Sequence, residues 1–163
     1  MEPAPGLLVT ANLKLERLLG EGGMGSVWVA HHAGLGTKVA VKFIATDIAK
    51  RRPELVERFR NEGGIAAKLR SPHVVQVFDH GFTEDGTPYL AMELLEGEAL
   101  DARLKREPLS LREIALIVSQ TCQVLGRAHK RGVVHRDIKP GNIFLEDSEY
   151  DIFIKVLDFG IAK

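Results

Sequence analysis

Residues 135–142 read His-Arg-Asp-Ile-Lys-Pro-Gly-Asn, and they carry the most informative chemistry in the sequence. They follow a long helical pattern and precede an apolar run, so we expect a loop held between rigid elements, where functional residues often lie. A carboxylate, an ammonium and a carboxamide stand within it, at Asp137, Lys139 and Asn142. A second carboxylate opens the triplet Asp-Phe-Gly at residues 158–160. A base for a hydroxyl, a cation for phosphate oxygens and oxygen ligands for Mg²⁺ are the groups that phosphoryl transfer requires.

The two blocks resemble the H-R-D-L-x-x-x-N and D-F-G signatures of protein kinases, with Ile138 in place of leucine. Either triplet alone is better explained as a solvated turn, but two ordered blocks with eight fixed positions favour the kinase interpretation. The resemblance implies that Asp137 orients the substrate hydroxyl and accepts its proton, and that Lys139 neutralises the γ-phosphate. It also implies that Asn142 and Asp158 hold Mg²⁺. A lysine two residues after the aspartate resembles the serine/threonine branch of the family.

A glycine-rich segment, residues 20–27, follows a strand-like alternation at residues 13–19 and has the pattern G-x-G-x-x-G-x-V. Such turns let backbone N–H groups approach phosphate closely. A dinucleotide-binding turn is the competing interpretation, and Asp47 stands about twenty residues further on, as that fold requires. That fold also needs a helix to begin at Gly25, whereas residues 26–31 are β-branched and aromatic and predict a strand. We therefore predict a hairpin flap over phosphates.

Lys42 stands inside the apolar strand predicted at residues 37–44, where a snorkelling surface lysine is the ordinary interpretation. The next predicted helix begins near Pro53 and ends before Ser71, and its apolar stripe includes Glu62. An inward carboxylate needs a partner, because an unpaired buried charge is costly. We therefore expect Lys42 to pair with Glu62, as the resemblance also implies, although the glycines at 63–64 are expected to loosen the helix.

The strand expected at residues 89–94 runs into a segment that resembles the connection between the two kinase lobes. By that resemblance, Met92 lines the back of the adenine pocket and the backbone from Glu93 to Leu95 binds the base. Another strand is expected at residues 74–79. The complete set of ATP-binding residues implied by the resemblance is Gly20, Glu21, Gly22, Gly23, Met24, Gly25, Val27, Ala40, Lys42, Glu62, Met92, Glu93 and Leu95.

The second half of the sequence predicts mostly helix. A short helix is expected at residues 99–105, and a capping box, Ser-Leu-Arg-Glu, opens a long helix over residues 110–130. We expect Cys122 to be buried within that helix as a small hydrophobe. Short strands are expected at residues 143–145 and 152–157. The predicted inward stripe of the long helix comprises Ile114, Ile117, Val118, Thr121, Leu125 and Ala128.

Composition excludes several classes of protein. The 163 residues carry 22 basic and 22 acidic side chains, so no charge excess suggests nucleic-acid binding. No apolar run approaches the roughly 18 residues of a membrane span. The single cysteine suits a reducing compartment, and the first residues lack a signal peptide, so we expect a cytoplasmic location.

We therefore predict an α+β, protein-kinase-like fold. Residues 1–12 are a lead-in, residues 13–95 form an antiparallel five-stranded small lobe with one helix and the hinge, and residues 96–163 begin a mainly helical large lobe. We expect an ATP- and Mg²⁺-dependent serine/threonine kinase acting on protein substrates. The alternative is a catalytically silent module that binds a nucleotide or a partner.

The family's activation segment and A-P-E block are not found after Gly160, so we expect a truncated kinase domain. A partner protein is then expected to cover the apolar large-lobe surface that later helices would otherwise bury.

Overall fold

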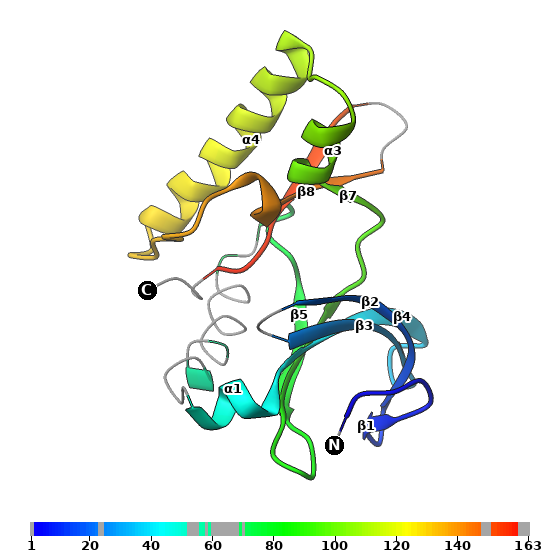
Figure 1. The fold of residues 1–163 in the computed structure, drawn as a ribbon. Coiled ribbons are helices and arrows are strands. Elements are labelled where there is room, and N and C mark those ends of the chain that lie inside the picture. Colours follow the sequence, from blue (N-terminus) through cyan, green and yellow to red (C-terminus); the bar gives the residue numbers. More distant parts are fainter. Residues whose placement is uncertain are drawn as a thin grey trace. The chain divides into compact units, whose positions relative to one another are not determined.

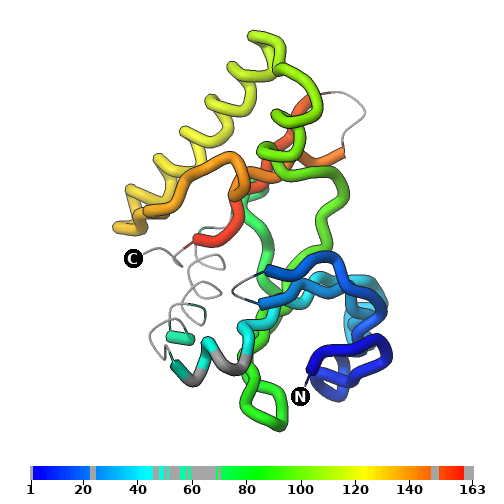
Figure 2. Tube along the Cα trace, viewed as in Figure 1, coloured from blue at the N-terminus to red at the C-terminus, as the bar shows by residue number. Residues whose placement is uncertain are grey.

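The computed structural model describes residues 2–22, 25–51, 56–57, 59, 69, 71–147 and 151–159. The chain forms two compact units, Met1–Gly63 with Gln76–Leu94, and Gly64–Val75 with Leu95–Lys163 (Figures 1 and 2). In chain order the elements are β1 (Leu8–Thr10), β2 (Leu13–Gly22), β3 (Gly25–His32), β4 (Thr37–Ile44), α1 (Thr46–Arg51), β5 (Val77–Phe82), β6 (Pro88–Glu93), β7 (Gly97–Ala99), α3 (Leu100–Arg106), α4 (Leu111–His129), the 3₁₀ turn η1 (Pro140–Asn142), β8 (Ile143–Glu146) and β9 (Phe153–Val156). No helix in these described ranges is long and apolar enough to cross a membrane.

The first unit is built on a six-stranded antiparallel sheet in the order β1-β2-β3-β4-β6-β5, which is strongly curved in Figure 1. It contains the five predicted strands and one more. Strands β2 and β3 form the predicted hairpin, with Gly22 opposite Gly25. The strand that follows Gly25 is incompatible with a dinucleotide-binding turn, which would need a helix there. The hairpin predicted for the glycine-rich segment is therefore confirmed.

The additional strand β1 lies in the segment that the sequence predicted to be a loose lead-in. The N–H of Gly6 donates to the carbonyl of Leu15 at 2.8 Å, and the N–H of Leu15 donates to the carbonyl of Leu7 at 2.9 Å. Val9 is buried against the sheet. The predicted lead-in therefore contains a strand, which pairs with the start of β2 through a tight turn, with Leu8 opposite Lys14 and Thr10 opposite Leu13.

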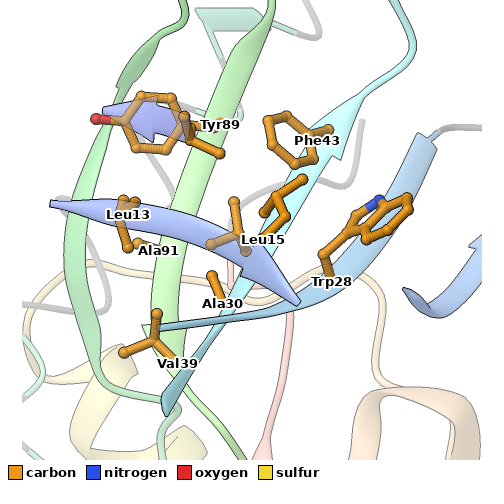
Figure 3. Close-up of a cluster of buried hydrophobic side chains, with 10 residues drawn as sticks. Leu13, Leu15, Trp28, Ala30, Val39, Phe43, Tyr89 and Ala91 are labelled. Carbon is orange, nitrogen blue, oxygen red and sulfur yellow. The ribbon is translucent and has the colours of Figure 1, made fainter. Parts of the chain in front are cut away.

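The two faces of the sheet differ. One face carries the main apolar cluster, in which strand alternation places every second residue, and Figure 3 shows its side chains packed on one side of the strands. The opposite face carries Ile44 and Leu90, which pack with Phe59. The main cluster comprises Val9, Leu13, Leu15, Trp28, Ala30, Val39, Val41, Phe43, Tyr89 and Ala91. Burial of this cluster fixes which side chains of β3 and β4 remain for a site on the other face.

Some elements differ from the prediction. Strand β5 begins three residues later than predicted, because Val74 forms a parallel bridge with Val156 in the second unit. The helix α1 and the strand β7 were not predicted. The helix predicted from Pro53 lies mostly outside the described residues, of which Phe59 and Leu69 are buried.

In the second unit, α4 begins at the predicted capping box. The hydroxyl of Ser110 accepts the N–H of Glu113 at 3.3 Å, and the carboxylate of Glu113 accepts the N–H of Ser110 at 2.6 Å. These two hydrogen bonds satisfy two of the N–H groups that a helix start leaves without partners. The one from the N–H of Ser110 to the carboxylate is the main reason that the pKa of Glu113 lies below its usual value.

The predicted inward stripe of α4 is partly wrong. The buried residues are Ile117, Thr121, Val124 and Ala128, whereas Ile114 is 43% exposed and Val118 is 54% exposed. Cys122 is also exposed, contrary to prediction. A 3.6-residue period fits two adjacent stripes of this sequence almost equally well. Packing of α4 against β9 selects the stripe that is buried.

Strand β9 forms one edge of the three-stranded sheet β7-β8-β9, and side chains and loop groups cover that edge. The Gln120 amide of α4 donates to the carbonyl of Ile152 at 2.7 Å and accepts the N–H of Ile154 at 3.0 Å. The ring of His73 bonds the carbonyl of Ile154 at 2.9 Å. Val156 donates its N–H to the carbonyl of His73 at 2.8 Å and accepts the N–H of Val75 at 3.4 Å.

Candidate functional site

The loop after α4 gathers the three predicted catalytic residues at one carboxylate. The ammonium of Lys139 lies 2.8 Å from Oδ2 of Asp137, and Nδ2 of Asn142 lies 3.0 Å from the same oxygen. Nδ2 of Asn142 also donates to the main-chain carbonyl of Asp137 at 2.8 Å. The turn η1 makes this possible, since it reverses the chain and returns Asn142 to a residue five positions earlier.

These contacts set the ionisation of Asp137. The hydrogen bond from Lys139 is the largest influence, and the amide of Asn142 adds to it, so the pKa of the carboxyl lies below its usual value. Partial desolvation opposes this shift but does not cancel it. Asp137 is therefore a carboxylate at neutral pH, and it can accept a hydrogen bond or a proton from a hydroxyl.

His135 joins this loop to residues 157–159. Its ring is 1% exposed; Nε2 lies 2.8 Å from the carbonyl of Leu157, and Nδ1 lies 3.3 Å from the N–H of Asp137. A carbonyl only accepts and an amide N–H only donates, so both bonds are satisfied by a neutral ring with its proton on Nε2. The ring also meets that of Phe159 edge-on, with centroids 4.6 Å apart.

Two residues near this histidine have unusual backbone angles. Arg136 has φ 67° and Asp158 has φ 57°, in the left-handed region that residues other than glycine adopt uncommonly. Such positions cost on the order of 1–3 kcal/mol each and cluster at functional sites. The surrounding hydrogen bonds hold both residues in place, including the one from the N–H of Leu157 to the carbonyl of Asn142 at 2.9 Å.

The side-chain oxygen of Asn142 could serve as a ligand for a small cation. Because Nδ2 is occupied by Asp137, the amide oxygen Oδ1 is the atom that remains, and no hydrogen bond within the described residues engages it. The main-chain carbonyl of Asn142 accepts the N–H of Leu157, the residue that immediately precedes Asp158. No cluster of three or more His, Cys, Asp or Glu side chains occurs among the described residues. Mg²⁺ does not need one, because it is commonly held by one or two protein oxygens together with phosphates.

The first unit brings a second group of predicted residues onto one face of its sheet. Val27 of β3 lies opposite Lys42 of β4, and Lys42 lies opposite Leu90 of β6. Ala40 lies opposite Met92 in the same register. Strand alternation therefore puts Val27, Ala40, Lys42 and Met92 on the face opposite the main apolar cluster.

The hairpin tip comes close to β4 through a glycine. Gly25 has φ 149°, and a Cβ there would lie 1.9 Å from the carbonyl oxygen of Phe43. Only glycine fits this approach. Gly20, Glu21 and Gly22 complete the described part of the turn, whereas Gly23 and Met24 lie outside the described residues. Glu62, the predicted partner of Lys42, also lies outside them.

The end of β6 is held by two hydrogen bonds between Glu93 and Gln76. The N–H of Glu93 donates to the carbonyl of Gln76 at 2.9 Å, and the carboxylate of Glu93 accepts the N–H of Gln76 at 2.7 Å. Leu95, in the second unit, is only half-buried, and its N–H makes no backbone hydrogen bond within the described part of the chain. An unpaired N–H in this connection is a donor available to a ligand.

The sequence analysis did not predict that the rings of His135 and Phe159 are in contact. Both residues stand in the two quoted motifs, but their sequence spacing carries no signal of a ring contact. The only available indication was that each motif places an aromatic ring beside its functional carboxylate.

Comparisons with known proteins agree with this geometry. Residues 13–163 match the protein kinase domain family. The serine/threonine-protein kinase PknA of Mycobacterium tuberculosis is 42% identical over 168 aligned residues, which cover all of this chain and 38% of that protein. The serine/threonine-protein kinase Pkn1 of Myxococcus xanthus is 42% identical over 153 residues, covering 93% of this chain and 22% of that protein.

A solved structure is also similar. The crystal structure of the Mycobacterium tuberculosis PknI kinase domain has a TM-score of 0.82 and 32% identity, and the match covers all of this chain and 64% of that one. The chain thus spans less than two fifths of the length of these curated relatives and under two thirds of this structure. On its motifs, its backbone and these similarities, the chain belongs to the protein kinase family, among the bacterial serine/threonine kinases.

Proposed function

We propose that this chain provides the nucleotide-binding and catalytic-loop parts of an ATP-dependent protein serine/threonine kinase. The observation that carries the proposal is the carboxylate of Asp137, which is held ionised by Lys139 at 2.8 Å and oriented by Asn142 at 3.0 Å. An ionised, oriented carboxylate beside a cation is what transfer of a phosphoryl group to a hydroxyl requires.

In this proposal, Asp137 aligns the serine or threonine hydroxyl of a protein substrate and accepts its proton. Lys139 stands beside the same oxygen, so its charge stabilises the negative charge on the transferred group. Nδ2 of Asn142 donates to the main-chain carbonyl and to Oδ2 of Asp137, and these two hydrogen bonds keep the carboxylate in one orientation. Proximity and electrostatics then supply most of the rate enhancement.

Asn142 and Asp158 are the residues that would hold Mg²⁺, with Oδ1 of Asn142 left available by the hydrogen bonds of its Nδ2. The ion would neutralise phosphate charge and orient the transferred group. For the nucleotide itself, we assign the Gly20–Gly25 hairpin and Lys42 to the phosphates, with Glu62 as the partner of Lys42. Val27, Ala40 and Met92 would contact the base on their shared sheet face, and the backbone from Glu93 to Leu95 would bind its edge.

Calorimetry of Mg²⁺–ATP binding tests the nucleotide part. Lys42→Met should weaken binding by about tenfold or more, since it removes a charge from the face that we assign to phosphates. Lys38→Met is the matched control, because it removes the same charge from the same strand, where Lys38 is exposed and paired with Glu16 at 2.8 Å. Equal affinities for the two variants would refute the assignment.

Transfer of ³²P from labelled ATP to a basic protein substrate tests the catalytic part. Asp137→Asn should abolish transfer while leaving Mg²⁺–ATP binding within about twofold, because the side chain would act on the hydroxyl. Undiminished transfer by Asp137→Asn would refute the role of Asp137. Nucleotide binding with no transfer in the unmodified chain would instead favour the silent nucleotide- or partner-binding module.

The exposed apolar face of α4 supports a protein partner for the second unit. Leu111 is 87% exposed, and Ile114 and Val118 lie on the same side of the helix. Association measured by sedimentation should be lost in Val118→Asp if a protein covers this face.

We also place the chain in the cytoplasm, where ATP is available and a lone cysteine remains reduced.

A further inference from the structure

A cavity of about 970 Å³ lies beside the hairpin tip of the first unit. Its walls come from the N-terminal segment, the β2–β3 hairpin, the end of β4 and the turn before β6. Its lining includes Glu2, Leu18, Glu21, Trp28, Phe43 and Thr87. The volume is typical of small-ligand sites.

Strand register places the aromatic wall of this cavity on the sheet face opposite Lys42. Trp28 lies opposite Val41 and belongs to the main apolar cluster, whereas its neighbour Val27 lies opposite Lys42. Leu18 lies opposite Trp28, and Glu21 lies opposite Ser26, so both share the face of Trp28. Ile44 of the opposite face also lines the cavity, so the cavity lies against the Trp28 face and adjoins the hairpin that we assign to the phosphates.

The inner wall of the cavity is aromatic and buried. Trp28 and Phe43 are buried, and both point to the same side of the strands in Figure 3. The indole N–H of Trp28 donates to the hydroxyl of Ser26 at 2.9 Å, which fixes the orientation of the ring. Leu18, which is 40% exposed, adds an accessible aliphatic surface at the side.

The charged side chains that line the cavity in the described part of the chain are all acidic. Glu2 and Glu21 are its charged lining residues, and no basic side chain lines it within the described part of the chain. Among those residues, no hydrogen bond or ion pair engages either carboxylate. Aromatic rings and uncompensated carboxylates around an apolar space are complementary to a cation on an apolar stem.

We propose that this cavity binds the side chain of an arginine that is flanked by an aliphatic residue in a peptide segment. The guanidinium would lie between Glu21 and Glu2, and its stem and the aliphatic neighbour would pack on Leu18, Trp28 and Phe43. Because Glu21 and Gly22 belong to the glycine-rich hairpin, an occupant here would touch that hairpin from the side away from Lys42.

The sequence contains a single tryptophan, so the emission of Trp28 reports directly on this cavity. The probe is N-acetyl-leucyl-arginine amide, compared with the citrulline analogue, which has nearly the same shape but no charge. We expect a saturable change in emission with the arginine peptide and binding at least about tenfold weaker with citrulline. No saturable change, or equal binding of the two peptides, would overturn the proposal.

Variants locate the bound peptide. Glu2→Gln with Glu21→Gln should weaken binding by about tenfold. The control pair, Glu84→Gln with Glu96→Gln, removes two exposed glutamates outside the cavity and should not weaken it. Equal losses in both pairs would indicate non-specific attraction and refute the site.

Lys42→Met separates this site from the nucleotide site. The proposal requires unchanged peptide binding in this variant and in the presence of a non-hydrolysable ATP analogue. Displacement of the peptide by the analogue, with binding lost in Lys42→Met, would place the peptide on the other face and refute the proposal. Failure of ATP to bind would leave the peptide result unaffected.

Discussion

Replacement of His135 is the sharpest test of the candidate site, because this buried ring joins two segments that are 22 residues apart. His135→Phe keeps a ring of similar size against Phe159 but removes both hydrogen bonds. The carbonyl of Leu157 loses a 2.8 Å bond, and the N–H of Asp137 loses a longer one of 3.3 Å. A buried group left unsatisfied costs about 1–3 kcal/mol, and the longer bond contributes less, so we expect a loss of about 2 kcal/mol in the free energy of unfolding.

His135→Ala should cost more, because it also removes the ring and leaves a cavity. Loss of the contact with Phe159 and incomplete collapse of the site add about 2 kcal/mol, for a total of about 4 kcal/mol. The assay is urea unfolding followed by circular dichroism at 222 nm, with comparison of midpoints at equal slopes. His129→Ala, at an exposed position in the last turn of α4, should change stability by less than about 0.5 kcal/mol.

Two results would refute this reasoning. A His135→Phe variant as stable as the unmodified chain would mean that the two hydrogen bonds contribute nothing. A His135→Ala variant equal to His135→Phe would mean that the ring contact with Phe159 contributes nothing.

Three further predictions follow from local geometry. Gly25→Ala should displace the hairpin and destabilise the first unit by more than about 2 kcal/mol, since its Cβ would meet the carbonyl of Phe43; Gly20→Ala, with open space around its Cβ, should cost about 1 kcal/mol or less by thermal unfolding. Ser110→Ala should lower stability by about 1 kcal/mol in the same assay, through loss of the cap on α4. Cys122 should react with a thiol reagent in the folded chain at a rate close to that in urea, since its side chain is exposed; a strongly protected thiol would contradict this.

The features that were correctly predicted depend on neighbours in the sequence. The β2–β3 hairpin follows from glycines flanked by β-branched residues, and the start of α4 follows from Ser110 and Glu113, three positions apart. Asp137, Lys139 and Asn142, which the sequence placed in one loop, also lie within six residues, although the hydrogen bonds among them were not predicted. Such short-range patterns can be interpreted without knowledge of the rest of the fold.

The features that were missed depend on distant partners. Ile114 and Val118 were assigned to the buried stripe because the helical period allows it, but the contact of α4 with β9 places them in solvent. The role of His135 depends on the carbonyl of Leu157, and no periodicity encodes that pairing. Most of the element containing Glu62 lies outside the described residues, so its pairing with Lys42 stays a prediction.

The covered edge of β9 has a consequence for how this chain meets other chains. An open edge strand offers unpaired N–H and C=O groups on which a foreign strand can assemble. Here the carboxamide of Gln120 imitates a peptide group of a neighbouring strand, and the ring of His73 occupies the next carbonyl. The edge of β9 is therefore covered by side chains and by the backbone of residues 73–75, and cross-β growth from β9 would first have to detach α4. Gln120→Leu preserves the approximate size of that side chain but leaves two backbone groups of β9 without their partner. The Gln120 amide therefore protects this edge from pairing with a foreign strand.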